Sequence, residues 1–246
     1  MADPAMAEQR LAQLYDPLNG ERDDLDVYAA MADEFGALSI VDIGCGTGTF
    51  ACLLASRGLT VTAVDPSASS LDIARAKPGA ELVRWVHGVA TDLPPLRADL
   101  ATMTANVAQE IVSDDDWRMA LRGALAALRP GGRLVFETRD PAQKAWLAWN
   151  RGETYLRTTI PGIGGLETWF ELNEISDGVV TFSGIYHFES DGLRLNPTSS
   201  LRFRTRDQVA ASLAEAGFAL DEIRDAPDRP GKELVFIARK PVQDPD

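Results

Sequence analysis

The residues from Val41 to Gly48 combine three glycines with one carboxylate in a pattern that can bind an organic ligand. Their sequence, VDIGCGTG, follows an apolar run typical of a strand and precedes a stretch with helical spacing. Glycines at such a turn let a ligand approach the backbone amides at a helix N-terminus. Asp65, about twenty residues further on, ends the next predicted strand, where a carboxylate accepts hydrogen bonds from ribose hydroxyls. The alternative role for Asp65 is that of a turn residue before Pro66.

The glycine spacing and the charge of Asp42 disfavour a dinucleotide, and with it a nicotinamide oxidoreductase. The fingerprint G-x-G-x-x-G needs a glycine where Thr49 stands, and Gly48 comes one residue early. Asp42 beside a pyrophosphate would place like charges about 4 Å apart, which costs on the order of 4 kcal/mol at an effective dielectric near 20. S-adenosylmethionine carries cationic ammonium and sulfonium groups instead, so the same carboxylate favours it.

The elements that must position these residues alternate between strands and helices over residues 37 to 140, which is typical of a parallel sheet covered by helices on both faces. Strands are predicted at 39–43, 60–65, 82–87, 98–103 and 133–138, and helices at 49–57, 67–76 and 114–128. Ser113 is the expected N-cap of the last helix. Thr205 and Gln208 form a capping box for a helix ending at Gly217, and strands at 218–225 and 233–239 form a hairpin at the edge of the sheet.

Residues 141–205 differ in texture from the flanking segments. Trp146 and Trp149 fall on one face of a predicted short helix, and the pairs Asp177-Gly178 and Asp191-Gly192 each separate two β-like runs, a strong hairpin signal. The predicted fold is α/β, with a seven-stranded, mostly parallel, Rossmann-like sheet whose final strand is antiparallel, plus an inserted antiparallel β meander. We expect a helical lid at 1–36, a cofactor-binding domain at 37–140 and 206–246, and an acceptor, lid or dimer region at 141–205.

Four successive motifs resemble those of class I S-adenosylmethionine-dependent methyltransferases of the bacterial small-molecule type. They are VDIGCGTG at 41–48, TVTAVDPS at 60–67, HGVATDLPPLRADL at 87–100 and LRPGGRLVFE at 128–137. The resemblance covers residues 37–140 and, more weakly, 206–239. It implies in-line transfer of a methyl group from S-adenosylmethionine to a small-molecule acceptor. The alternative is a protein of this fold that binds the cofactor without methyl transfer, in a cyclisation or as a regulatory module.

The resemblance, together with the reasoning on Asp42, also implies a set of cofactor contacts. Gly44, Cys45 and Gly46 would line the methionine and ribose portion, and Val89 with Ala90 the adenine edge. The full expected set is Tyr15, Asp42, Gly44, Cys45, Gly46, Asp65, Pro66, Val89, Ala90 and Thr104. Many relatives have an aspartate where Val89 stands, so its contact with the adenine amino group must be lost or come from Thr91 or Asp92. For Tyr15, a lid role competes with simple helix packing.

Candidates for a general base are few. They are Glu137 and Arg139 at the end of the fifth predicted strand, Gln109 and Glu110 after the fourth strand, and His187 in the meander, and none of them stands out. His187 is also explained as an exposed strand residue. A base is needed only if the acceptor arrives protonated.

Two groups of side chains in the meander region have competing explanations. Arg202, Arg204 and Arg206 share a strand face, which predicts either a site for an anionic acceptor or, as we favour, a solvated face that pairs with acids. The aromatic side chains form either an acceptor wall or, more commonly for such spacing, core packing; they are Trp146, Trp149, Trp169 and Phe170.

The composition limits the classes of partner that the protein is expected to bind. The 246 residues carry 24 Lys and Arg against 37 Asp and Glu, a net charge of −13, which disfavours nucleic acid and anionic membrane surfaces. Cys45 and Cys52 lack a metal-ligand spacing, and the three aspartates from 114 to 116 suit a helix N-terminus better than a metal, so no metal is predicted. The N-terminus lacks a basic and apolar leader, and no run approaches the roughly 18 apolar residues of a membrane span. We therefore expect a cytoplasmic protein, with a homodimer as one candidate assembly.

Overall fold

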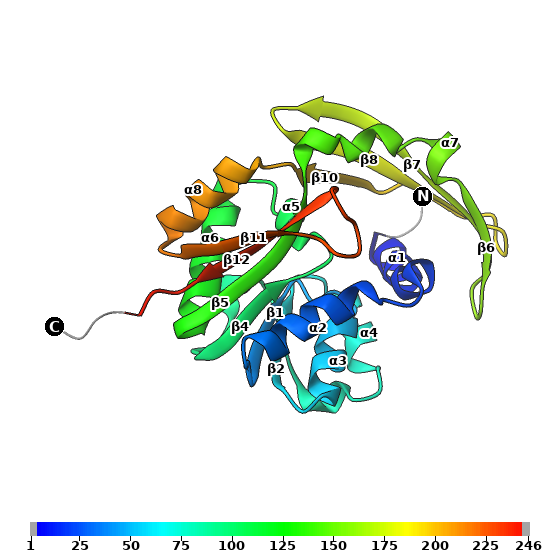
Figure 1. Cartoon of the computed structure of the whole chain (residues 1–246). Coiled ribbons are helices and arrows are strands. Elements are labelled where there is room, and N and C mark those ends of the chain that lie inside the picture. The colour runs from blue at the N-terminus through cyan, green and yellow to red at the C-terminus, as the bar shows by residue number, and fades with distance from the viewer. Residues whose placement is uncertain (1–3, 243–246) are drawn as a thin grey trace.

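The computed structural model describes residues 4–242 and contains a main sheet whose strands follow the order β11-β12-β5-β4-β1-β2-β3 (Figure 1). The strands are β1 (Ser39–Ile43), β2 (Thr60–Asp65), β3 (Val83–His87), β4 (Ala98–Met103), β5 (Leu128–Arg139), β11 (Ala219–Asp225) and β12 (Glu233–Arg239). Neighbours from β3 to β5 pair in parallel, whereas β12 is antiparallel to both β5 and β11. The predicted sheet with an antiparallel final strand is confirmed.

Helices cover both faces of this sheet because alternate strand residues point to opposite sides. Ile40 packs with α2 (Asp24–Glu34) and α3 (Thr49–Ser56), while Val41 packs with α6 (Asp114–Ala127) and α8 (Arg206–Ala216). The other helical segments beside the sheet are α4 (Ala68–Arg75), α5 (Val107–Glu110), η1 (Ala80–Leu82) and η2 (Ala90–Asp92). The hydroxyl of Ser113 accepts the Asp116 amide, which confirms the predicted cap of α6.

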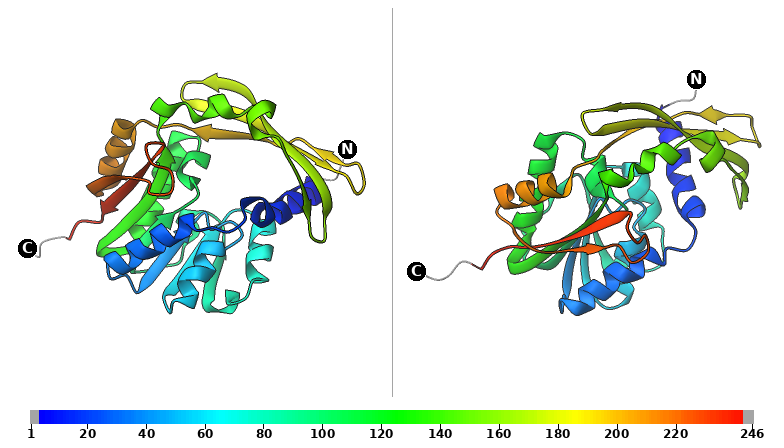
Figure 2. Two further views of the ribbon diagram at one scale, coloured as in Figure 1. Left: turned by 45° about the vertical axis from the view of Figure 1, so that its right-hand side comes forward. Right: turned by 45° about the horizontal axis from the view of Figure 1, so that its top comes forward.

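A second, antiparallel sheet of order β10-β8-β7-β6, with β9 paired to β8, arches over one end of the main sheet (Figure 2). Its strands are β6 (Leu156–Ile160), β7 (Gly164–Ser176), β8 (Val179–Phe188), β9 (Arg194–Leu195) and β10 (Thr198–Arg202). Both predicted Asp-Gly pairs stand at hairpin turns, between β7 and β8 and between β8 and β9. The single short helix predicted around Trp146 is wrong: three short segments occur, namely η3 (Pro141–Gln143), η4 (Ala145–Ala148) and α7 (Arg151–Thr154).

The helix α1 (Pro4–Asn19) packs against the second sheet. Its Leu14 is 1% exposed and belongs to the same apolar cluster as Leu166 and Phe188. The guanidinium of Arg10 lies 3.8 Å from the centre of the Phe188 ring and pairs with the Asp191 carboxylate at 2.6 Å. Apolar and charged contacts therefore join α1 to a sheet that the chain forms more than 130 residues later.

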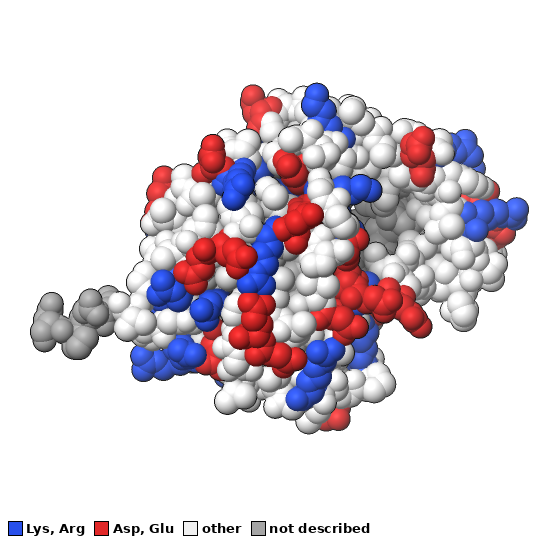
Figure 3. All heavy atoms as spheres, in the orientation of Figure 1, with Lys and Arg blue, Asp and Glu red and all other residues white. Residues whose placement is uncertain are grey.

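Acidic and basic side chains are interspersed on the face drawn in Figure 3. One pair joins distant elements, because both terminal nitrogens of Arg224 on β11 donate to the carboxylate of Glu34 on α2, at 2.8 and 2.7 Å. Among the described residues, no helix has the length and apolar character needed to cross a membrane.

Replacing Leu213 by alanine tests the packing of α8 on the main sheet. Leu213 is 0% exposed, so we expect Leu213→Ala to lower the free energy of unfolding by about 2 to 5 kcal/mol. Urea denaturation followed by circular dichroism measures the change. Leu220→Ala, at a partly exposed position on β11, is the control and should cost much less; equal losses would contradict this packing.

Candidate cofactor site

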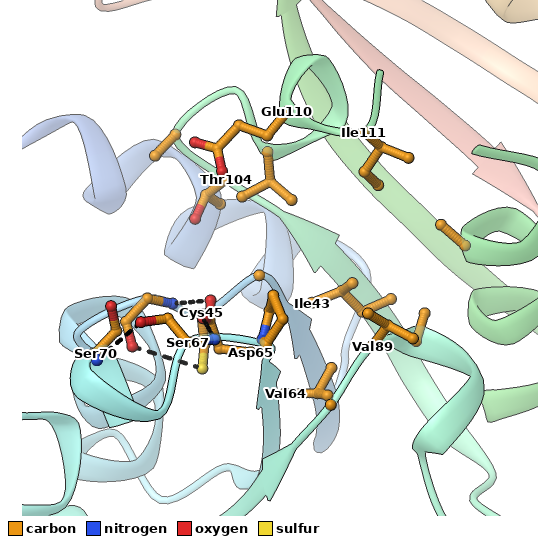
Figure 4. Close-up of a pocket in the computed structure, with 18 of the residues that line it drawn as sticks. Ile43, Cys45, Val64, Asp65, Ser67, Ser70, Val89, Thr104, Glu110 and Ile111 are labelled. Atoms are coloured by element: carbon orange, nitrogen blue, oxygen red, sulfur yellow. Dashed lines mark hydrogen bonds between the residues drawn. The ribbon is translucent and has the colours of Figure 1, made fainter. Parts of the chain in front are cut away.

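A cavity of about 700 Å³ opens at the carboxyl ends of β1, β2 and β4 (Figure 4). The residues predicted to contact the cofactor line this cavity, with the exception of Asp42. The elements that follow β1, β2, β3 and β4 all contribute to its wall, as expected at the crevice of an open α/β sheet. Topology therefore brings together residues that lie far apart in the sequence.

The Asp65 carboxylate joins two turns at the edge of this cavity. Its Oδ2 accepts the Gly46 amide at 2.8 Å, and its Oδ1 accepts the Ser67 amide at 2.8 Å. The hydroxyl of Ser67 in turn caps α4 by accepting the amide of Ser70 (Figure 4). A carboxylate has about four acceptor positions, so these two bonds orient Asp65 and leave capacity for hydroxyl groups of a ligand.

The glycine loop forms a cradle that fits an organic cofactor. Gly46 has φ +53°, and a Cβ at this position would meet nothing within 4 Å, although the residue lines the cavity. Gly44, at φ +73°, has no such space, because a Cβ there would come within 2.5 Å of Val107. A side chain at 46 would fill the space over the loop, whereas one at 44 would displace the start of α5.

The end of α1 is fastened to the glycine loop by Asp16. Oδ1 of Asp16 accepts the hydroxyl of Thr47 at 2.6 Å, and its Oδ2 pairs with the ammonium of Lys77 at 2.7 Å. Lys77 also donates to the hydroxyl of Thr49 at 2.6 Å. This cluster holds the neighbouring Tyr15 on the cavity wall, where desolvation raises the pKa of its phenol. Sequence reasoning missed Asp16, because its partners are more than 30 residues away.

Arg22 is a second cavity residue that sequence reasoning missed. It stands between α1 and α2, outside every motif, and its guanidinium donates two hydrogen bonds of 2.8 Å to the Asp24 carboxylate. The cavity wall places Arg22 beside Tyr15 and the glycine loop. A guanidinium there can bind a ligand carboxylate.

The opposite wall contains η2 and the start of α6. Val89 and Thr91 line it, whereas the Asp92 carboxylate is outside the lining and accepts the Val89 amide at 2.8 Å. Of the two residues suggested to replace the missing aspartate contact, only Thr91 therefore faces the cavity. A Cβ at Gly123 would come within 2.6 Å of the Ala90 backbone, so this glycine lets α6 pack closely on η2.

Arg204 corrects the prediction of a solvated arginine face. Its guanidinium is buried against the Trp117 ring, donates to the Ile111 carbonyl at 3.0 Å and pairs with Asp114 at 3.2 Å. The solvated reading failed because the strand β10 ends at Arg202, so the alternation assumed for 204 and 206 does not apply. Arg204 instead holds the loop before α6, which includes Ile111 and Ser113 of the cavity wall.

Asp42 lies beneath the cavity instead of on its surface. It is 1% exposed, its Oδ1 accepts the Thr102 hydroxyl at 3.0 Å, and its Oδ2 has no hydrogen-bond partner. It shares a sheet face with Ile40, which directs it toward β4 and the layer of α2 and α3. Burial, aided by the charge of Asp65, raises the pKa of Asp42 to about 7.

Three candidates for a general base, Glu137, His187 and Arg139, lie outside the cofactor cavity. Glu137 is buried and accepts the Asn106 amide at 2.7 Å, and burial raises its pKa to about 7. His187 lies on the second sheet, 3.2 Å from the carboxylate of Glu167, and does not line the cofactor cavity. Arg139 donates to Gln109 at 3.0 Å and borders a second cavity.

That second cavity, of about 430 Å³, lies between the main sheet and β8 and β10. Its lining shares Ala105 and Glu110 with the cofactor cavity, so the two spaces meet at these residues. Within residues 4–242, no group of three or more His, Cys, Asp or Glu side chains is placed to hold a metal ion.

The raised pKa of Asp42 predicts a pH-dependent stability. Because its folded-state pKa lies above the usual 3.8, its favourable contribution is complete below about pH 4 and is lost as the pH rises through about 7. Asp42→Asn removes this titration, so its stability relative to wild type should rise by about 1 to 4 kcal/mol between pH 5 and 8. Urea denaturation at several pH values measures this, with Asp72→Asn as the exposed control. A constant difference would show that Asp42 does not titrate in this range.

Comparisons with known proteins agree with this geometry. A family model described as a methyltransferase domain matches residues 40–132. The demethylmenaquinone methyltransferase of Thermotoga maritima is 31% identical over 183 residues, covering 73% of this chain and 69% of the relative. The cypemycin N-terminal methyltransferase of a Streptomyces species is 29% identical over 147 residues, which cover 58% of this chain and only 60% of that protein.

The arrangement of the two sheets is also shared with solved structures. An S-adenosylmethionine-dependent methyltransferase from Clostridium acetobutylicum superposes with a TM-score of 0.76 at 16% identity, covering 95% of this chain and 98% of the other. At this identity the likeness shows the common fold. Together with the loop, Asp65 and the Thermotoga maritima relative, it leads to one conclusion: the chain belongs to the class I S-adenosylmethionine-dependent methyltransferases.

Proposed function

We propose that this protein transfers a methyl group from S-adenosylmethionine to a small-molecule acceptor by in-line displacement. The observation that carries the proposal is the Asp65 carboxylate, oriented by the Gly46 and Ser67 amides at the wall of a cavity of about 700 Å³. When bound, the cofactor supplies a methyl group already activated by its sulfonium. The protein must then align the acceptor and exclude water.

In this proposal, different cavity residues contact different portions of the cofactor. Asp65 and Pro66 bind the ribose, with Asp65 accepting both hydroxyls, while the loop from Gly44 to Gly46 and Thr104 line the methionine portion. Val89 and Ala90 lie along the adenine, and Thr91 supplies a polar contact at its edge. Arg22 pairs with the carboxylate of the methionine portion, and Tyr15 on α1 covers the bound molecule. Asp42 supports the loop from below, and a cationic ligand above it favours the ionised form of its carboxylate.

The acceptor enters through the second cavity, which meets the first at Ala105 and Glu110. Residues 1–36 and 141–205 serve as the covering elements over a cofactor-binding domain formed by 37–140 and 206–246. The modest size of this space favours a small molecule over a nucleic acid, as does the net charge of −13. We further propose a cytoplasmic location, where S-adenosylmethionine is made, and a homodimer that forms through the second sheet.

Release of S-adenosylhomocysteine from a library of small acceptors tests whether the protein is an enzyme. We expect acceptor-dependent release by the wild-type protein. Tight cofactor binding without release from any acceptor would support a binding protein of this fold instead.

Asp65→Ala tests the cofactor geometry. The substitution removes charge-assisted hydrogen bonds worth about 1.5 to 3 kcal/mol each, so S-adenosylhomocysteine should bind at least about tenfold more weakly. Isothermal titration calorimetry measures the affinity. Asp72→Ala, on the exposed surface of α4, removes the same charge and should change binding less than twofold. Unchanged binding by Asp65→Ala would refute the proposed ribose contact.

Arg22→Met tests the contact with the methionine carboxylate. We expect S-adenosylhomocysteine to bind about 10 to 100 times more weakly, because a charge-assisted contact of about 1.5 to 3 kcal/mol is lost. 5′-Methylthioadenosine lacks the amino-acid portion and serves as the matched ligand control. Its affinity should change little. If both ligands lose affinity to the same extent, Arg22 acts by stabilising the fold and not by binding the ligand carboxylate.

A further inference from the structure

We infer that the second cavity binds a hydroxylated amine and that Glu110 accepts the proton that this amine releases on methylation. The inference rests on the proposed function and names the substrate class of the same site. It stands on the position of Glu110, on the absence of a partner for its carboxylate, and on an unpartnered polar atom of Asn106 in the second cavity.

Glu110 stands where the two cavities meet. It ends α5 and belongs to the lining of both spaces. In Figure 4 its carboxylate extends toward Thr104, across the cavity from Asp65. An acceptor that moves from the second cavity toward a methyl group held over the glycine loop therefore passes beside this carboxylate if it crosses where the two linings share Glu110.

The carboxylate of Glu110 makes no hydrogen bond or ion pair with any described residue. The buried carboxylates of Glu137 and Glu233, by contrast, each bind a partner, Glu137 the Asn106 amide and Glu233 the Arg229 guanidinium. Desolvation and the charge of Asp65 raise the pKa of Glu110, and the nearby Arg139 opposes this rise. Glu110 keeps an exposed surface, so its unpaired carboxylate is accessible to a cationic donor, and a raised pKa makes it a better proton acceptor.

The Asn106 side chain provides the second observation. It is buried, lines the second cavity, and its Oδ1 has no hydrogen-bond partner, while its Nδ2 donates to Glu233 at 3.2 Å. Such an orphaned acceptor is costly, and because Oδ1 exposes less than 1 Å² of surface, a ligand in the cavity supplies its donor once the side chain turns toward it. Ser199 lies opposite Phe182 in the pairing of β10 with β8, so its hydroxyl shares the face that borders this cavity, whereas the Ser200 hydroxyl is bonded to that of Thr181 at 2.9 Å.

The charge of Arg139 bears on which groups the acceptor carries besides its amine. It donates to Gln109 and lies 3.8 Å from the carboxylate of Glu233, so its charge is partly balanced already. Neutral oxygens suit this wall better than a second carboxylate. Phe182 adds one apolar surface. The lining therefore matches a small amine whose carbon skeleton carries hydroxyl groups.

The chemistry of methyl transfer selects the amine over the hydroxyls of the same molecule. An ammonium has no free electron pair, so it must first lose a proton, which the Glu110 carboxylate accepts. The amine nitrogen then forms a bond to the methyl carbon, and the bond from carbon to sulfur breaks with its electron pair remaining on sulfur. An aliphatic hydroxyl is about as weakly acidic as water, so a carboxylate does not ionise it.

Matched pairs of ligands test this inference on the protein saturated with S-adenosylhomocysteine. The pairs are serinol with glycerol and glucosamine with glucose, which differ by an amine in place of a hydroxyl. Saturation-transfer NMR and titration measure binding. We expect at least one amine to bind about tenfold or more tightly than its partner, and Glu110→Gln to abolish this preference, as the loss of one charge-assisted contact predicts. With S-adenosylmethionine, the preferred amine should release S-adenosylhomocysteine, at a rate that Glu110→Gln lowers.

Glu174→Gln, on the exposed part of β7, removes an equivalent charge and should leave the amine preference unchanged. Calorimetry with S-adenosylhomocysteine separates the two proposals. If the wild type fails to bind it, the proposed function itself fails. If it binds with similar affinity to the wild type and both variants, but the amines bind no better than the hydroxyl partners or do not bind, the inference about Glu110 is overturned while the proposed function stands.

Discussion

The site depends on one carboxylate that holds two turns together. Asp65 ends β2 and accepts an amide from the glycine loop after β1 and another from the turn that begins α4. Each turn by itself has many conformations, because the loop contains glycines at positive φ and the second turn contains a single capping serine. Bonded to the same side chain, they form a fixed edge, and the crevice at the carboxyl ends of β1 and β2 acquires a defined shape.

The helix α1 extends this arrangement to the rest of the molecule. Its apolar side, which includes Leu14, packs on the second sheet, while Asp16 near its end binds the glycine loop. Tyr15 lies between these two contacts and faces the cavity. A single helix thus links the loop that holds the cofactor in our proposal to the sheet that covers the acceptor cavity. A displacement of the loop therefore changes the contacts that α1 makes with the sheet.

Local patterns were sufficient for three of the strands that end at the cavity. The predicted bounds of β1, β2 and β4 agree with the structure, because short apolar runs between glycine and proline turns specify buried strands. The loop and Asp65 were found in the same way, since each lies directly at a strand end.

The residues whose roles were not predicted from the sequence act through partners that are distant along the chain. Arg22 and Asp16 belong to no motif, and their roles depend on how α1 packs. The orientation of Asp42 toward Thr102, and of Arg204 toward the carbonyls before α6, follows from contacts 60 or more residues apart, which spacing along the chain does not reveal. Glu110 was one of several general-base candidates, because only its place in the lining of two cavities distinguishes it from its neighbours.

A crystal structure with S-adenosylhomocysteine tests the central claim most directly. The account predicts both ribose hydroxyls within about 2.5 to 3.0 Å of the Asp65 carboxylate, and the ligand carboxylate beside Arg22. Adenosine bound elsewhere, or a ribose that leaves Asp65 bonded only to the Gly46 and Ser67 amides, would contradict it.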